Sequence, residues 1–377
     1  MKKLEKSVPV IRFKGFSEAW EQRKFIEIIN RLSKTSNSSI LPKVEYEDII
    51  AEEGRLNKDI SNKFDSRKGI LFQPKNILYG KLRPYLKNWL YPDFKGVAVG
   101  DFWVFEAIEA TPRFIYNLIQ SDSYQKVAND TAGTKMPRSD WTKVSNSSFF
   151  IPKESSEQKR IGTFFKQLDD TIALHQRKLD TLKQMKKGLL QQMFPKSEED
   201  VPKIRFADFD EEWYQRKLGE EFEKINERND GSFGKTHWIS VAKMYFVEPN
   251  KVLSNNIDTR TYVMRKGDIA FEGHSNTDFK FGRFVANDIG PGIVSELFPV
   301  YRHKTNYDNN YWKNAIQLEH IIAPIYSKSI TSSGNSSNKL DSKHFLNQKI
   351  YIADFEEQEK IGSIFKQLDN TIILYQN

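Results

Sequence analysis

The longest helix that the sequence predicts covers residues 157–193, and it constrains the whole fold. Steps of four and three residues from Ile161 meet apolar side chains almost throughout, which is the spacing of a helix that packs along another helix. Ser155 and Gln158 have the spacing of a capping box, and Pro195 cannot continue the helix. At 1.5 Å per residue the helix is about 55 Å long. We therefore expect it to act as a spacer.

An internal repeat predicts the partner of this helix. Residues 357–376 are identical to residues 157–176 at most positions, and the identities include polar side chains. Two unrelated amphipathic helices would share the apolar spacing alone, so we expect these two helices to pack against each other. The predicted contact residues of the helix pair are Ile161, Phe165, Leu168, Ile172, Leu179, Leu182, Ile361, Phe365, Leu368 and Ile372.

A second repeat lies upstream of each helix. Residues 8–27 and 201–220, here called the entry segments, share an Ile-Arg-Phe triplet and a following tryptophan. The variable segments that follow, residues 28–156 and 221–356, share no useful identity. The two copies have thus kept similar entry segments and helices, whereas the segments between them have diverged. This predicts two different recognition domains that are held by a repeated set of helices and entry segments.

Short apolar and aromatic runs predict that both variable segments form α+β, or mixed α/β, domains. The predicted strands lie within residues 69–73, 76–86, 97–107, 262–273 and 292–302. One helix is predicted at residues 112–128 and another near residues 310–326. A polar loop with glycine follows each of them, at residues 131–141 and 332–341.

Composition narrows the class of protein. The chain has no cysteine, which excludes disulfides and thiolate metal sites and agrees with a reducing compartment. No apolar run approaches the ~18 residues of a membrane span, so we expect a cytoplasmic protein without membrane contact. The net charge of +8 permits a polyanionic partner, although many proteins with such a charge bind none.

An entry segment, a variable domain and a long helix, given twice, resemble the specificity subunit of type I restriction–modification systems. The resemblance is carried by Ile11 to Trp20 and Ile204 to Trp213, by the loops at 131–141 and 332–341, and by EQ-x-x-IG-x-x-FKQLD in both helices. It implies that each variable segment is a target recognition domain that reads one half of a bipartite site on double-stranded DNA. It also implies that the two helices form an antiparallel coiled coil, giving the chain a pseudo-twofold repeat.

The resemblance further implies partner subunits. Two adenine methyltransferase subunits and restriction subunits would assemble on the chain, and these partners would bind S-adenosylmethionine, ATP and magnesium, whereas this chain would bind no cofactor. The first helix continues 17 residues past Gln176, whereas the second stops at Asn377. We therefore expect either an asymmetric helix pair or a shortened chain.

The predicted division of the chain follows the repeat. Residues 1–156 form the first target recognition domain with its entry segment, and residues 157–194 form the central spacer helix. Residues 195–356 form the second target recognition domain with its entry segment, and residues 357–377 form the second, short helix.

Polar and basic residues in predicted turns are the candidate DNA contacts. Long cationic side chains reach phosphates and guanine edges, and amides match adenine. Ordinary solvated loops would explain each residue about as well. The candidates are Lys81, Arg83, Lys135, Arg138, His274, Asn276, Lys280, Arg283, Asn335, Ser336, Asn338 and Lys339.

Enzyme motifs are weak in this sequence. Residues 229–236 nearly match a phosphate-binding loop but lack its first glycine, and Pro92-Asp93 with Glu157 to Lys159 imitates the order of a nuclease motif. His175 and Lys186 interrupt the apolar spacing of the long helix and are expected to set register or contact a partner. We thus expect a non-enzymatic DNA-recognition subunit with no metal site. The alternatives are a scaffold that holds two protein-binding domains and a fused nuclease.

Overall fold

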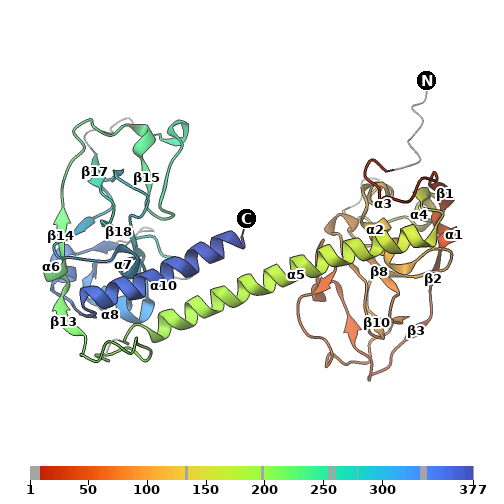
Figure 1. The fold of residues 1–377 in the computed structure, drawn as a ribbon, viewed down its shortest axis with the longest axis horizontal. Coiled ribbons are helices and arrows are strands. Elements are labelled where there is room, and N and C mark those ends of the chain that lie inside the picture. Colours follow the sequence, from red (N-terminus) through yellow and green to blue (C-terminus); the bar gives the residue numbers. More distant parts are fainter. Residues whose placement is uncertain are drawn as a thin grey trace. The chain divides into compact units, whose positions relative to one another are not determined.

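The computed structural model of the protein describes residues 9–131, 135–196, 199–253, 257, 260–277, 279–331 and 338–376. The chain divides into two compact units, unit 1 (Met1–Leu174) and unit 2 (His175–Asn377). The division falls within the long helix α5 (Ser155–Gln192), which begins two residues earlier than predicted (Figure 1).

The core of unit 1 is a four-stranded antiparallel sheet of strand order β2-β11-β8-β9. Side chains alternate between its faces, so that Ile77 and Tyr79 enter one apolar cluster and Leu78 enters another. Both faces are buried, which explains why these strands read as nearly continuous apolar runs. The strands are β2 (Ile29–Leu32), β8 (Ile77–Gly80), β9 (Trp89–Leu90) and β11 (Phe102–Ala107).

Helices cover one face of this sheet and smaller strands cover the other. The helices are α1 (Phe25–Ile28), α2 (Pro112–Gln120), α3 (Asp122–Ala128) and α4 (Trp141–Asn146). The second sheet contains β3 (Thr35–Ser36), β4 (Lys43–Val44), β7 (Gly69–Phe72) and β10 (Gly96–Ala98). The other short elements of unit 1 are η1 (Tyr46–Asp48), β5 (Ile49–Ile50), β6 (Arg55–Leu56) and η2 (Pro84–Leu86), and β5 pairs with β6.

Unit 2 repeats this plan with different side chains. Its central sheet has the order β14-β21-β18-β19, again antiparallel and again between two apolar clusters. The strands are β14 (Phe222–Ile225), β18 (Ile269–Glu272), β19 (Arg283–Ala286) and β21 (Val300–His303). The helices are α6 (Leu218–Glu221), α7 (Asn309–Ala315), α8 (Glu319–Ser329) and α9 (Ser342–Asn347). The predicted mixed α/β fold of both variable segments is therefore confirmed.

Short strands and turns complete unit 2. They are η3 (Lys235–His237), β15 (Ile239–Ser240), β16 (Tyr245–Phe246), η4 (Pro249–Lys251), β17 (Thr261–Met264), β20 (Gly292–Ser295), β22 (Ile330–Thr331) and β23 (Lys339–Leu340). Strands β17 and β20 pair in antiparallel fashion, as do β15 with β16 and β22 with β23.

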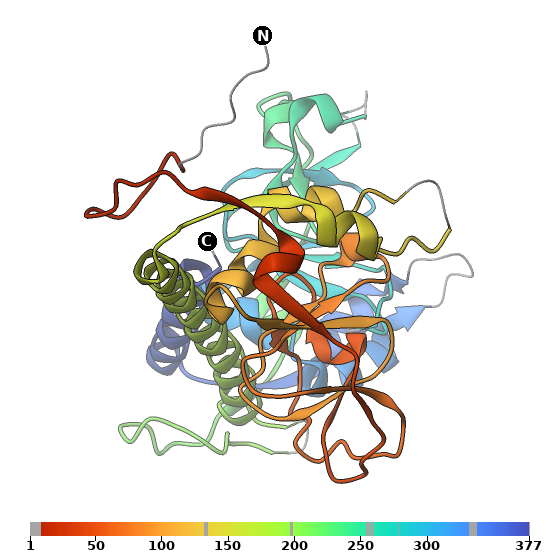
Figure 2. The ribbon, with the colours of Figure 1, turned by 90° about the vertical axis from the view of Figure 1, so that its right-hand side faces the viewer.

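In each unit a strand before the variable segment pairs with a strand at the end of that segment, and the two form an antiparallel ribbon. β1 (Glu21–Lys24) pairs with β12 (Ser148–Ile151), and β13 (Tyr214–Lys217) pairs with β24 (Lys349–Ile352), both antiparallel. Figure 2 shows the first ribbon, in which the red β1 runs beside the yellow strand that leads into α5. The variable segment of each unit thus begins and ends at neighbouring points.

Two predicted helices are each broken into two. The helix expected at residues 112–128 is interrupted at Ser121, whose backbone is extended and whose hydroxyl accepts a hydrogen bond from the Tyr124 N–H as the cap of α3. The helix expected near residues 310–326 ends at Ala315 and resumes at Glu319. The apolar spacing continues across both breaks, so periodicity alone did not reveal them.

Within unit 2 the second repeated helix, α10 (Phe355–Leu374), runs antiparallel to the C-terminal part of α5 (Figure 1). Lys186 forms an ion pair with Asp369 at 2.6 Å, and Lys178 Nζ donates to the Tyr375 hydroxyl at 3.4 Å. The residue numbers of these contacts rise along α5 as they fall along α10, so the two helices are antiparallel. The ring of His175 lies 5.4 Å from that of Tyr375.

The predicted contact residues of the helix pair have different surroundings. Ile361, Phe365 and Leu368 belong to the core cluster of unit 2 or pack against it. Leu179 is buried, and Leu182 and Ile372 are half-buried. In unit 1, Ile161 packs against the core, whereas the side chains of Phe165, Leu168 and Ile172 are exposed.

Candidate nucleic-acid interface

Two loops of unit 1 lie side by side at the end of β8. The Ser139 N–H donates to the Lys81 carbonyl at 2.9 Å, and the Arg83 N–H donates to the Pro137 carbonyl at 2.7 Å. Leu82 and Arg138 form an isolated antiparallel bridge between the same loops. Three of the predicted DNA contacts, Lys81, Arg83 and Arg138, are thereby brought together from positions more than 50 residues apart in the sequence.

Asp101 orients two of these cations. Its carboxylate lies 3.5 Å from Lys81 Nζ and 3.1 Å from Arg138 Nη2, and the Arg138 side chain is about half exposed. The Tyr46 hydroxyl donates to the Asp101 carbonyl at 2.6 Å and accepts from the Leu82 N–H at 3.1 Å. Burial raises the pKa of Tyr46, so this hydroxyl remains neutral and continues to tie the loop to the sheet.

The rest of the unit 1 loop pair suits a polyanion with stacked bases. Lys135 is exposed at the start of the second loop, and Tyr85 and Met136 expose large side chains beside the cations. Arg83 has a φ of +49°, a conformation that a non-glycine residue adopts at some cost. Cations combined with an exposed aromatic ring can bind phosphates, base edges and base faces.

Unit 2 has an equivalent loop pair, because β18 occupies the place of β8. The Asn338 N–H donates to the Gly273 carbonyl at 2.8 Å, the counterpart of the Ser139 to Lys81 hydrogen bond in unit 1. Asn338 Nδ2 also donates to the Ser275 hydroxyl at 3.0 Å. Lys339 follows at the start of β23 and is exposed. The same edge of the sheet thus presents the Asn338 amide beside Lys339 in unit 2, and three cations in unit 1.

Two other predicted contacts of unit 2 are engaged within the protein. The His274 imidazole Nδ1 hydrogen-bonds the buried Glu272 carboxylate, although most of the ring is exposed. Arg283 Nη2 donates to the Ala242 carbonyl, and its guanidinium lies 5.0 Å from the centre of the Phe279 ring. Arg283 is therefore held mainly as a structural residue, unlike the half-exposed arginine of unit 1.

The remaining candidates of unit 2 have three different outcomes. Asn276 closes a turn, since its Oδ1 accepts from the Phe279 N–H at 2.9 Å. Lys280 is exposed and available to a ligand. Asn335 and Ser336 lie outside the residues that the structure describes.

A buried ion pair joins each entry segment to its repeated helix. In unit 2, Arg205 donates to both oxygens of Glu357 at 2.8 Å, and Trp213 Nε1 adds a third hydrogen bond at 3.0 Å. We call this arrangement of an arginine, a tryptophan and a glutamate the clasp. The repeated letters were visible in the sequence, but their mutual contact was not inferred from them.

Unit 1 has the same clasp. Arg12 Nε and Nη2 donate to Glu157 at 2.6 and 2.7 Å, and Trp20 Nε1 donates to Glu157 at 3.3 Å. The hydrogen bonds with Glu157 raise the pKa of Arg12. The clasp gives the repeated Ile-Arg-Phe, Trp and Glu-Gln motifs a structural role that does not involve DNA.

The two enzyme motifs that the sequence resembles lack the structural surroundings that their chemistry needs. The Glu157 carboxylate, which a nuclease site would need, is bound in the clasp. Lys235, the lysine of the near-match to a phosphate-binding loop, donates to the Val252 carbonyl and begins a three-residue turn in place of a helix. Among the described residues, no group of three histidine, cysteine or acidic side chains could hold a metal ion. No helix in that part of the chain could cross a membrane.

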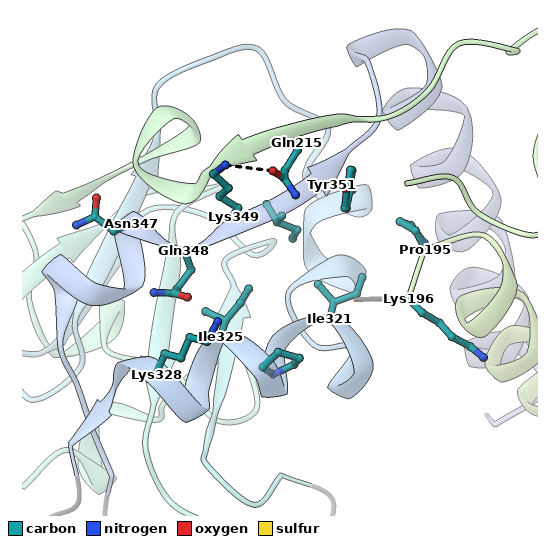
Figure 3. Close-up of a pocket in the computed structure, with 12 residues that line it drawn as sticks. Pro195, Lys196, Gln215, Ile321, Ile325, Lys328, Asn347, Gln348, Lys349 and Tyr351 are labelled. Carbon is teal, nitrogen blue, oxygen red and sulfur yellow. Dashed lines mark hydrogen bonds between the residues drawn. The ribbon is translucent and has the colours of Figure 1, made fainter. Parts of the chain in front are cut away.

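A cavity of about 340 Å³ in unit 2 offers no catalytic set either (Figure 3). Lys196, Lys328 and Lys349 line it, and Lys349 Nζ donates to Gln215 Oε1 at 3.2 Å. The described residues around it include no carboxylate and no histidine, so neither group is present there to act as a general base.

Comparisons with known proteins concern the fold and one segment of the sequence. Residues 17–184 match the family model of the type I restriction modification DNA specificity domain. A solved S subunit of a type I restriction–modification system from M. genitalium is 13% identical with a TM-score of 0.55, covering 98% of this chain and 93% of that chain. A structure on complex assembly and conformational transition of the type I R-M system is 16% identical with a TM-score of 0.52, covering 97% and 93%. No curated protein matches the sequence.

The matched segment covers most of unit 1 and part of α5, and the model that it matches is that of a DNA specificity domain. Over residues 17–184 this match confirms the predicted resemblance to the specificity subunit of type I restriction–modification systems. The same match agrees with the predicted role in DNA sequence recognition.

Proposed function

We propose that each unit reads one half of a bipartite, asymmetric site on double-stranded DNA through the loop pair at the end of its central sheet. The observation that supports this most directly is the equivalence of two hydrogen bonds, Ser139 to Lys81 and Asn338 to Gly273, which place different residues at the same edge of the two sheets. A common framework with different contact residues is what two different half-sites require.

The two loop pairs would read DNA in different ways. In unit 1, Lys81, Arg83, Lys135 and Arg138 provide positive charge for phosphates and guanine edges. In unit 2 the amide of Asn338 has the donor and acceptor pattern that matches adenine. Arg283 is omitted from this set because its guanidinium is already bonded within the protein.

Partner subunits would supply the chemistry. Two adenine methyltransferase subunits and restriction subunits would bind the repeated frame in the cytoplasm, and S-adenosylmethionine, ATP and magnesium would bind to them. This proposal is supported by the family of residues 17–184, which is named for type I restriction and modification.

The decisive experiment is the methylome of cells that express this chain with its methyltransferase partner. We expect methylated adenines in an interrupted, asymmetric motif. Replacing residues 28–156 with the equivalent segment of another specificity subunit should change one half of that motif alone. If the motif does not change, the division of recognition between the two units is wrong.

A binding experiment separates this function from that of a protein scaffold. Fluorescence anisotropy with a duplex that carries the methylated motif should show affinity that falls steeply with salt, because bound cations displace counterions from the phosphates. A scaffold would show weak binding without preference for the motif. A duplex with one altered half-site is the matched control.

A further inference from the structure

A cavity of about 350 Å³ in unit 1, here called the basic cavity, is lined by four cationic side chains. None of the described residues that line it is acidic, and its volume is within the range of known ligand sites. It lies where β8 begins and β11 ends, whereas the loop pair lies at the opposite end of these strands. Its cations are Lys75, Arg113, Lys159 and Lys166.

Arg113 brings an unused guanidinium to the basic cavity. Its stem packs against Gly162, since a Cβ at that glycine would lie 2.8 Å from Arg113 Cγ. Its guanidinium lies 4.4 Å from the centre of the Tyr91 ring. No described residue forms an ion pair or a hydrogen bond with this group, and Asp169, which acts on it electrostatically, does not line the cavity. A guanidinium with free donors can bind two oxygens of a phosphate at once.

The lysines add charge that the protein itself does not neutralise. In the described part of the chain neither Lys75 nor Lys159 forms an ion pair, whereas Lys166 pairs with Asp170. Lys75 also has a φ of +71°, a conformation that suits glycine and that a lysine adopts at some cost. A charged side chain at a position that favours glycine points to a role for its charge.

The start of β8 has a counterpart in unit 2 at the start of β18. The Lys75 N–H donates to the Pro92 carbonyl at 2.9 Å, and the Gly267 N–H donates to the Asn287 carbonyl at 2.8 Å. Gly267 has a φ of +91°, so the two backbones are alike and the side chain differs. In unit 2 the Tyr307 hydroxyl occupies the space where a side chain at Gly267 would begin. The place of the lysine is therefore filled in unit 2.

The helix that follows the central sheet also differs in charge between the units. The Thr111 N–H donates to Gln158 Oε1 at 2.8 Å, and the Asp308 N–H donates to Gln358 Oε1 at 3.4 Å. These hydrogen bonds make the starts of α2 and α7 counterparts. The neutral Thr111 thus stands where unit 2 has a carboxylate.

The repeated helices show the same difference beside the basic cavity. In unit 2 the Asp308 carboxylate lies against Gly362 of α10, whereas in unit 1 the Arg113 side chain lies against the equivalent glycine of α5. Lys159 of α5 corresponds to Glu359 of α10. Every one of these differences makes unit 1 more positive, and all of them surround one cavity. A generally basic surface would not concentrate them there.

We propose that the basic cavity of unit 1 binds the phosphate group of a small anion, such as pyrophosphate or a nucleoside diphosphate. Arg113 would donate to two phosphate oxygens, and Lys75 and Lys159 would balance the remaining charge. A compact anion fits because the turn before β8, α2 and α5 all contribute cations to one hollow of limited volume. The site lies away from the loop pair, so the proposal does not depend on the proposed DNA function.

The test measures binding of inorganic pyrophosphate and of ADP to the full chain by isothermal titration calorimetry. We expect saturable binding with one anion per chain. Arg113→Gln should weaken binding by about tenfold or more, because it removes charge-assisted hydrogen bonds to the phosphate. Tighter binding of ADP than of pyrophosphate would identify a nucleotide as the ligand, and weaker binding would identify an inorganic anion; both results support a phosphate site.

Lys75→Gly separates binding from folding, because it installs the residue of unit 2 at a backbone position that suits glycine. It should weaken pyrophosphate binding by about two- to fivefold, and thermal unfolding should show no loss of stability. The matched control is Lys126→Gln, which removes an exposed lysine of α3 that does not line the basic cavity. This control should bind pyrophosphate as the unchanged chain does.

The proposal is overturned if pyrophosphate binding does not saturate, if Arg113→Gln binds as tightly as the unchanged chain, or if Lys126→Gln weakens binding as much as Lys75→Gly. A polyglutamate peptide and duplex DNA are tested in the same way. If Arg113→Gln weakens the binding of either polymer more than that of pyrophosphate, the basic cavity holds part of a larger polyanion and the proposal is wrong.

Discussion

The clasp of unit 2 should contribute a large part of that unit's stability, and Glu357→Gln tests this. The Glu357 side chain is fully buried and accepts three hydrogen bonds, while Arg205 retains 15% exposure. Glutamine keeps the shape but removes the charge, and it turns an amide donor toward the donors of Arg205 or Trp213. Breaking a buried pair on one side costs about 3–5 kcal/mol, and we expect the lower end because Arg205 can partly reach water.

A loss of about 3 kcal/mol corresponds to a melting temperature lower by about 6–12 °C for a unit of this size. Thermal unfolding followed by tryptophan fluorescence gives the size of the effect. Hydrogen exchange of the α10 amides then assigns the loss to unit 2, which matters because two units need not unfold together. Exchange in unit 1 should not change.

The matched control is Asp208→Asn, which breaks a second ion pair between the same entry segment and α10. Lys360 and Asp208 lie 3.0 Å apart, with 46% and 77% of their side chains exposed, so the loss should be at most about 1 kcal/mol. Replacing both Arg205 and Glu357 with methionine should cost less than Glu357→Gln alone, since no buried charge is left unpaired. If Glu357→Gln stays within about 0.5 kcal/mol of Asp208→Asn, the clasp does not stabilise unit 2 as reasoned.

Three further predictions concern other parts of the molecule. Arg138→Ala should weaken DNA binding and lower the slope of log affinity against log salt concentration by about 1. Asp101→Asn should instead tighten DNA binding, because it removes a negative charge beside two cations. Anisotropy titrations at several salt concentrations measure both affinities, and a change in the same direction for both variants would contradict the role given to these cations. Gly362→Ala should destabilise unit 2 in thermal unfolding, because the new methyl group would collide with Asp308 Oδ1, the cap of α7. Burial lowers the pKa of His303 to about 3, so the unfolded state binds a proton that the folded state does not, and unit 2 should lose up to about 1.4 kcal/mol per pH unit as pH falls from about 6.5 toward 3. In acid-unfolding curves His303→Gln should remove this part of the pH dependence, and an unchanged curve would contradict it.

The duplicated frame could be predicted from the sequence, because its signals are local and repeated. The long helix, its second copy and the apolar strand runs depend on spacing alone, and the structure has them close to the expected residues. Helix breaks were missed where a single side chain, such as Ser121, ends one helix and caps the next.

The candidate site was less predictable, because it depends on which distant groups the fold brings near. Arg138 and Arg283 are both arginines in polar loops, yet one is half exposed beside a carboxylate and the other donates to the carbonyl of Ala242. No local pattern distinguishes them. The partners in the clasp, Arg205 and Glu357, are likewise about 150 residues apart, so their repeated letters did not reveal their contact.

The paired ribbons, β1 with β12 and β13 with β24, have a consequence for how such chains diversify. Because each variable segment leaves and rejoins the frame at adjacent points, its length and internal sequence can change without moving either end. Recombination within the repeats would therefore exchange a complete variable segment. The proposed DNA preference would change with that segment, while the repeated helices and entry segments would stay the same.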